Sequence, residues 1–259
     1  MNRVVTIGVV LVSAVRAAWP VAGESFALEQ GLAGRTDIVG FWGFEVDGEY
    51  GAFCSSDIDR WRTEIYGCAW SPNCTRNSVV SGTEAFAGKT RKVQYPAGTF
   101  GPGDNGDNWP IAFDRVDSMT VTRYDSLYLR YYLRFSDTFD YQLGGKLPGL
   151  VGGNNWSRSG GDQPDGTNGW TTRYMWGGEG RVKLYAYLSP AHNPDIMTSQ
   201  WGSSVLFDHA NGGVPRALER GVWHCIEQFV RINDVGQANG VIRCWLNGEE
   251  ALVLDTVVF

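Results

Sequence analysis

The sequence has few residues of the kinds that bind metal ions. Its 259 residues include three histidines and five cysteines, and no two cysteines have CxxC spacing. A structural zinc site takes four such ligands, in pairs at short spacing. We therefore expect no metal site and no cofactor.

Charged residues are also scarce, at 19% of the chain, and the formal net charge is −6. An acidic protein repels nucleic acid and other polyanions, so any anionic partner has to be held by a local group of cations. The 34 glycines indicate many tight turns rather than long surface helices. After the N-terminus, no apolar run is long enough to cross a membrane.

The N-terminus itself has the pattern of a secretory signal. Arg3 supplies the positive charge, and residues 4–12 form a short apolar segment. We expect residues 1–23 to be a signal peptide with an uncertain cleavage site, and the protein to be secreted. The alternative is an uncleaved apolar N-terminus or anchor. Residues 24–259 are then a single domain, of which residues 24–90 are poorly defined by pattern.

Secretion would place the cysteines in an oxidising compartment, where two disulfides and one free thiol are the simplest expectation. Cys225 and Cys244 lie on two segments with the pattern of a β-hairpin, so they are candidates for a bridge across strands. Cys54 is a candidate partner for Cys68 or Cys74, and the sequence does not choose between them.

Period-two alternation predicts strands over 127–135 and 182–188. Residues 92–95 and 119–124 are further candidates, and 223–233 and 241–246 flank a turn-rich segment typical of a hairpin. Residues 42–50 are a weaker strand candidate, and 55–66 a candidate short helix. Because no helical period is sustained, the prediction is an all-β sandwich.

One group of residues is suited to acid–base chemistry on an acidic sugar. The segment 144–150 (GGKLPGL) carries Lys146, 170–173 carries Thr171 and Arg173, and 183–187 carries Tyr185 and Tyr187. Residues two apart on a strand share a face, so each segment presents its polar side chains together. Cations can neutralise a sugar carboxylate, and adjacent cations would lower a tyrosine pKa from about 10 toward the range of a base. Either tyrosine is a candidate base, with the other tyrosine or Lys146 as acid.

Each part of this group also has an ordinary structural interpretation. Alternating tyrosine and leucine is typical of a solvated sheet face, and Lys146 between glycines and a proline fits a surface turn. Arg181, Lys183 and Arg134 are candidate substrate-binding cations, as Thr171 is a candidate hydroxyl donor, but Arg181 and Lys183 also fit solvated charges.

At these residues the chain resembles polysaccharide lyase family 14 and the related glucuronan lyases, over roughly residues 90 to 250. The GGKLPGL segment followed by the aromatic and basic strand is the specific part of the resemblance. It implies a β-jelly roll whose concave sheet binds an anionic polysaccharide, either alginate or glucuronan, and cleaves it by β-elimination. It also implies catalytic roles for Lys146, Arg173, Tyr185 and Tyr187, with threonine at position 171 where the family usually has serine.

The resemblance leaves two further expectations. The family fold would continue past Phe259 with at least one more strand, so the chain is expected to be truncated within a strand, which puts its activity in doubt. The alternative function is a non-catalytic protein that binds anionic polysaccharide on the same sheet. In both cases we expect a monomer whose partner is the polysaccharide, with no nucleic acid and no membrane.

Overall fold

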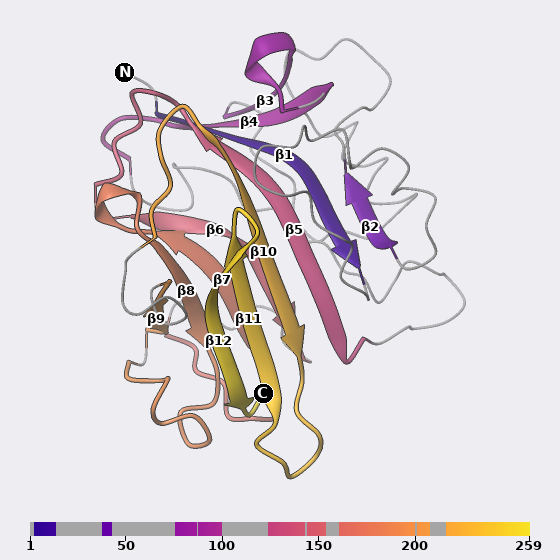
Figure 1. Cartoon of the computed structure of the whole chain (residues 1–259). Coiled ribbons are helices and arrows are strands. Elements are labelled where there is room, and N and C mark those ends of the chain that lie inside the picture. The colour runs from indigo at the N-terminus through magenta and orange to yellow at the C-terminus, as the bar shows by residue number, and fades with distance from the viewer. Residues whose placement is uncertain are drawn as a thin grey trace. The chain divides into compact units, whose positions relative to one another are not determined.

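The computed structural model is built almost entirely of β-strands (Figure 1). It describes residues 3–13, 38–42, 76–86, 88–99, 124–142, 144–153, 161–199, 201–207 and 216–259, the first two ranges by their backbone only. Its strands are β1 (Arg3–Ser13), β2 (Ile38–Trp42), β3 (Asn77–Ser81), β4 (Lys89–Tyr95), β5 (Ser126–Phe135), β6 (Gly145–Gly152), β7 (Trp170–Trp176), β8 (Val182–Tyr187), β9 (Ser203–Leu206), β10 (Trp223–Arg231), β11 (Gly240–Leu246) and β12 (Glu249–Val257). The described helices are the short 3₁₀ turns η4 (Gly82–Glu84) and η6 (Gly178–Gly180).

The described strands form two sheets. One has the order β12-β11-β10-β5-β1-β4-β3, with β2 paired to β1, and the other has the order β6-β7-β8-β9. The strand pairs whose register is defined are antiparallel. This arrangement confirms the predicted all-β sandwich of two antiparallel sheets. None of the described residues lies in a helix with the length and hydropathy of a membrane span.

The chain divides into two compact units. The first contains residues 1–124, 130–140 and 220–225, and the second contains 125–129, 141–219 and 226–259. In the first unit, Phe86 stacks on Tyr132 with ring centroids 4.1 Å apart and meets Trp223 edge-on at 5.2 Å. Cys225 is buried in the same cluster.

Hydrogen bonds within the second unit show which face of β7 points into the interior. The Tyr174 hydroxyl donates to the Glu227 carbonyl, and the Thr172 hydroxyl lies 3.2 Å from the side-chain oxygen of Gln228. That oxygen also accepts the Leu150 N–H at 3.0 Å. These bonds join β6 and β7 to β10 through the buried interior. Because side chains alternate along a strand, Thr171 and Arg173 face the other way.

Two cysteines fall within the described residues, and neither is part of a disulfide. The predicted bridge between Cys225 and Cys244 is wrong. The register of β10 and β11 pairs Cys244 with Gln228, so the two cysteines are not cross-strand neighbours. Burial raises the pKa of Cys244 to about 12, which leaves it an unreactive thiol. The other three cysteines lie outside the described residues.

The two ends of the chain are also strands. Residues 4–12, predicted as the apolar part of a signal, lie in β1, which pairs with β4 from Arg3 opposite Tyr95 to Ile7 opposite Arg91. A valine-rich run suits a strand equally well, and cleavage of a signal stays a prediction. At the other end, β12 stops at Val257, two residues before the last. Asn193 accepts the Val258 N–H at 2.9 Å and donates to the Val258 carbonyl at 2.7 Å.

Most strand predictions that fall on described residues are confirmed. These are 92–95 in β4, 127–135 in β5, the predicted strand 182–188 as far as Tyr187 in β8, and the hairpin of β10 and β11. Strand β5 is buried on both faces rather than one, since Tyr132 and Leu133 are both inaccessible. The candidate helix at 55–66 lies outside the described residues, as do 119–123 and 43–50.

Candidate functional site

Strand register brings the predicted catalytic residues together on the outer face of the smaller sheet. Arg173 of β7 lies directly opposite Tyr185 of β8, and Thr171 lies opposite Tyr187. Lys146 of β6 is opposite Met175, which in turn is opposite Lys183. The four predicted catalytic residues therefore occupy three neighbouring strands of one unit.

An irregularity in β6 keeps Lys146 on this face. The register with β7 shifts between Leu147 and Gly149, so Pro148 is an extra residue in the strand. Gly149 then sits so close to β7 that a Cβ atom would lie 2.0 Å from the Thr172 carbonyl oxygen. Gly149 and Pro148 of the GGKLPGL segment thus have a structural role, and they position Lys146 on this face.

Two cations converge on one tyrosine ring. The Lys146 Nζ atom lies 5.5 Å from the centroid of Tyr185, and the Arg173 Cζ atom lies 5.8 Å from it. Partial burial, and secondarily the charge of Arg173, lowers the pKa of Lys146. Burial also lowers the pKa of Arg173, against the opposing effect of the two tyrosines. Both cations are therefore poorly solvated and would gain from a negatively charged ligand.

Arg173 has unused hydrogen-bonding capacity. Its Nε and Nη2 atoms are buried and have no hydrogen-bond partner among the described residues. A guanidinium group presents its donors as a planar fork that matches a carboxylate. An anion that accepts from these nitrogens would satisfy donors that are otherwise buried at a cost.

The two phenols form a hydrogen-bonded pair. Their oxygens are 3.1 Å apart, and each also lies within hydrogen-bonding distance of the Trp201 carbonyl, that of Tyr187 at 2.6 Å. The Tyr187 oxygen also accepts the Gly161 N–H at 3.3 Å. Tyr187 is fully buried, whereas Tyr185 is partly exposed. Because each phenol has one proton, one hydroxyl can donate to the carbonyl while the other donates to the neighbouring phenol.

The expected lowering of the tyrosine pKa is wrong for Tyr185. Burial, followed by the hydrogen bond and charge of Tyr187, raises its pKa to about 12, and Arg173 only partly offsets the rise. The site without substrate therefore keeps this phenol protonated. Nearby cations are not enough to make a phenolate when the same ring is partly removed from water.

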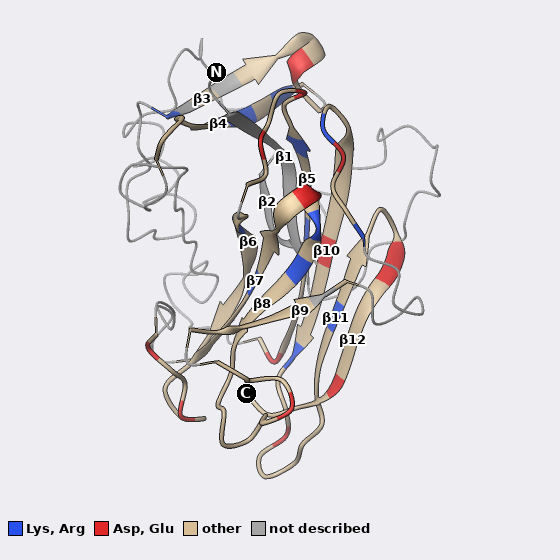
Figure 2. Cartoon of the chain, turned by 90° about the vertical axis from the view of Figure 1, so that its left-hand side faces the viewer, with Lys and Arg blue, Asp and Glu red and all other residues tan. Residues whose placement is uncertain are grey.

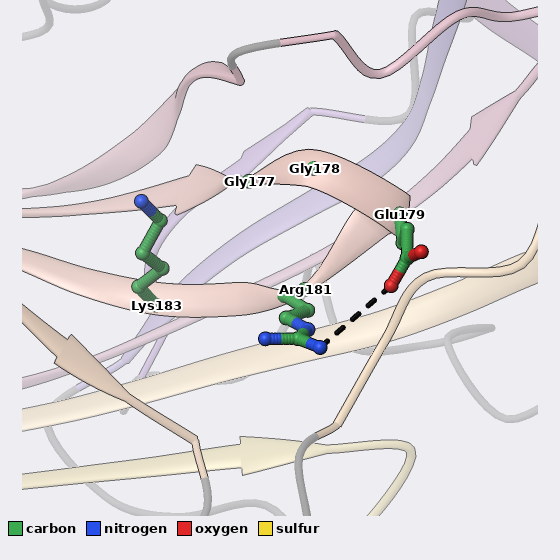
Figure 3. Close-up of a pocket in the computed structure, with 5 residues that line it drawn as sticks. All are labelled: Gly177, Gly178, Glu179, Arg181 and Lys183. Carbon is green, nitrogen blue, oxygen red and sulfur yellow. Dashed lines mark ion pairs between the residues drawn. The ribbon is translucent and has the colours of Figure 1, made fainter.

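The other predicted substrate-binding residues have different surroundings. Thr171 is buried on the outer side of β7. Arg181 and Lys183 line an open pocket of about 490 Å³ together with Gly177, Gly178 and Glu179. Figure 3 shows Arg181 turned toward Glu179, with an ion-pair distance of 3.7 Å, while Lys183 stands at the other end of the pocket. Arg134 belongs to the first unit, where it lies 3.9 Å from Asp137, and its substrate-binding role stays a prediction.

Figure 2 shows basic positions on β7 and β8, consistent with Arg173 and Lys183 on these strands. Within the described residues, no group of three or more histidine, cysteine, aspartate or glutamate side chains could hold a metal ion. The potential ligand-binding groups of this face are cations, phenols and backbone amides.

Sequence reasoning missed the turn at Trp201 and Gly202. The Trp201 carbonyl is the shared acceptor of both phenols, and no spacing rule connects it with residues on β8. Gly202 has φ of +85°, and a Cβ atom there would lie 2.5 Å from Cε2 of Tyr187 and 3.0 Å from Cε2 of Tyr185. The glycine therefore allows the turn to pack against both rings.

Replacing Gly202 with alanine is expected to displace the two phenols. A catalytic group moved by about 1 Å can cost up to about 100-fold in rate, so we expect kcat to fall by about 10- to 100-fold. The matched control is Gly236→Ala, because Gly236 has φ of +76° but no atom within 4 Å of its Cβ position. Equal kcat in the two variants would contradict the positioning role of the turn.

The fold and the site define a β-sandwich protein whose smaller sheet places two cations beside a pair of phenols. The model of the family Polysaccharide lyase 14 matches residues 84–259. The chain therefore belongs to polysaccharide lyase family 14, and its sandwich is the β-jelly roll that the sequence predicted.

Individual relatives agree with this assignment. The exolysin of Paramecium bursaria Chlorella virus 1 is 26% identical over 191 residues, which are 66% of this chain and 28% of the exolysin. This chain thus matches under a third of that relative's length. The alginate lyase of Aplysia kurodai is 25% identical with a TM-score of 0.56, over 75% of this chain and 74% of that one. The alginate lyase Aly36B is 22% identical with a TM-score of 0.58, over 82% and 76% of the two chains, which is evidence of shared fold.

Proposed function

We propose that this protein is a secreted, monomeric lyase that cleaves a 4-linked uronic acid polymer by β-elimination, with alginate as the first candidate substrate. The Aplysia kurodai enzyme, 25% identical, is described as an alginate lyase, which favours alginate over glucuronan. The observation that carries the proposal is the buried guanidinium edge of Arg173, which has no hydrogen-bond partner among the described residues and lies directly across from Tyr185.

The reaction explains why such an edge is needed. A base removes the proton at C5, next to the carboxylate, and the electron pair forms the C4–C5 double bond as the C4–O bond breaks. An acid then protonates the departing oxygen. Removing the proton would build a second negative charge beside the carboxylate, so stabilising this charge is the largest requirement. Arg173 and Lys146 supply two cations for it.

The phenol pair supplies the proton transfers. Tyr185 and Tyr187 are both candidates for the base, and whichever acts must first lose its own proton; the other tyrosine or Lys146 is the acid. Binding the sugar carboxylate between the cations brings the reacting carbon to the phenol side of the site. The hydroxyl–hydroxyl distance of 3.1 Å lets the pair share one proton during turnover.

The rest of the face extends the substrate-binding surface. Strand rise is about 3.3 Å per residue, so Lys183 lies about 7 Å along β8 from Tyr185. Lys183 has no ion-pair partner among the described residues, and it lines the same pocket as Arg181, at the other end. A second carboxylate of the polymer fits this position. Thr171 is buried beside the phenols, and its substrate-binding role stays a prediction.

The proposal is tested by following the ultraviolet absorbance of unsaturated products when the protein is incubated with alginate, polyglucuronate or hyaluronan. We expect absorbance to rise with alginate, and to rise equally after dialysis against a chelator, because the proposed chemistry uses no metal. Binding of alginate without any absorbance change would instead identify a non-catalytic binding protein.

A further inference from the structure

Trp201 combines an exposed ring with an anchored backbone. The residue is 58% exposed, a large fraction for tryptophan. Its carbonyl accepts from both phenols, and its N–H donates to the Ser199 hydroxyl at 3.1 Å. A residue held this firmly, with so much apolar surface in water, is typical of a binding site.

The ring is also held from one side. Gly161 lies against it so closely that a Cβ atom at position 161 would lie 2.6 Å from Cζ3 of the indole. The same glycine donates its N–H to Tyr187. The ring is thus fixed relative to the phenols through two independent backbone contacts, one at each residue.

We propose that Trp201 is a substrate-positioning residue whose indole stacks against a sugar ring of the polymer beside the phenol pair. This inference rests on the proposed function and adds an apolar contact to a site otherwise defined by charge. The C–H face of a pyranose ring is apolar, and an aromatic face offers large contact area with few rotatable bonds. The cations fix the carboxylate edge of the sugar, and the indole would fix the orientation of a ring in the chain.

The geometry places this contact where it affects orientation. The carbonyl of Trp201 touches the groups proposed to move the proton, so a sugar on the indole lies next to the reacting residue of the polymer. The polar contacts of a site select the chemical group that binds, here the sugar carboxylate. Stacking on the indole would fix the plane of the sugar ring.

The test is steady-state kinetics on alginate with Trp201→Ala and Trp201→Phe. We expect Trp201→Ala to raise KM by about tenfold or more, which corresponds to roughly 1.4 kcal/mol of binding, while kcat changes less. Trp201→Phe keeps an aromatic face and should recover most of the loss. The alkaline and acidic limbs of the pH profile should stay in place, because the backbone carbonyl remains in both variants.

The matched control is Val235→Ala, which removes exposed apolar surface from the hairpin between β10 and β11. Thermal melting of all variants separates loss of folding from loss of contact. An active wild-type protein whose KM is unchanged by Trp201→Ala overturns the stacking role alone. A wild-type protein that forms no unsaturated product from any uronate polymer overturns the proposed function, and the two failures are therefore distinct.

Discussion

A Tyr187→Phe variant is expected to lose about 100- to 10,000-fold in kcat, the usual range for removing a general acid or base. The substitution deletes one oxygen, which bonds to Tyr185, to the Trp201 carbonyl and to the Gly161 N–H. The ring stays in place, so the fold is retained. The pair loses one of the two hydroxyls proposed to take part in the proton transfers. Rates of product formation on alginate, with circular dichroism of the variant, measure the effect.

The matched control is Tyr174→Phe. Tyr174 is also fully buried, but it points to the inner face of β7 and donates to the Glu227 carbonyl. Losing that bond should lower the melting temperature with little change in kcat. A Tyr185→Phe variant, compared with Tyr187→Phe through their pH profiles, shows which phenol acts as base. A Tyr187→Phe enzyme with wild-type kcat contradicts the assignment of the pair.

The second large effect is expected for Lys146→Ala, with kcat reduced by about 100- to 1,000-fold, as for loss of one transition-state donor. The variant removes one of two cations beside Tyr185 and leaves Arg173 to neutralise the carboxylate alone. Lys183→Ala is the control, because that lysine shares the sheet face but lines the open pocket with Arg181 rather than the ring of Tyr185. It should raise KM more than it lowers kcat.

Lys146 also predicts a pH dependence. Partial burial and the neighbouring Arg173 lower its pKa, so the ammonium form is lost at a lower pH than in an ordinary lysine. Activity should therefore fall on the alkaline side as Lys146 becomes neutral. A Lys146→Arg variant, if active, should move this limb to higher pH, because arginine stays charged. A limb that does not move would assign it to another group.

The parts of this site that depend on strand periodicity could be predicted from sequence. Thr171 with Arg173, and Lys183 with Tyr185 and Tyr187, alternate along their strands as the pattern requires. The register between strands then aligns Arg173 with Tyr185, and no local pattern specifies that register. The bulge at Pro148 could likewise not be predicted, because period-two alternation assumes that no extra residue is inserted in the strand.

Other features required the folded chain. The sequence shows cations near tyrosines but not the burial that raises the pKa of Tyr185, so the direction of that shift was predicted wrongly. The carbonyl of Trp201 could not be anticipated, because every residue has a carbonyl and only the turn at Gly202 aims this one. The hairpin of β10 and β11 was predicted well, but its register separates the two cysteines expected to form a bridge.

The anchoring of the last residues has a consequence for handling the protein. Asn193 holds both backbone groups of Val258, and Asn233 accepts the Phe259 N–H at 2.8 Å. Asn193 lies on the same connection between β8 and β9 that carries Trp201. Loss of the contacts between Asn193 and Val258, by substitution or by proteolysis, would loosen this connection at a point remote in sequence from the phenols, so preparations of the protein should keep these contacts intact.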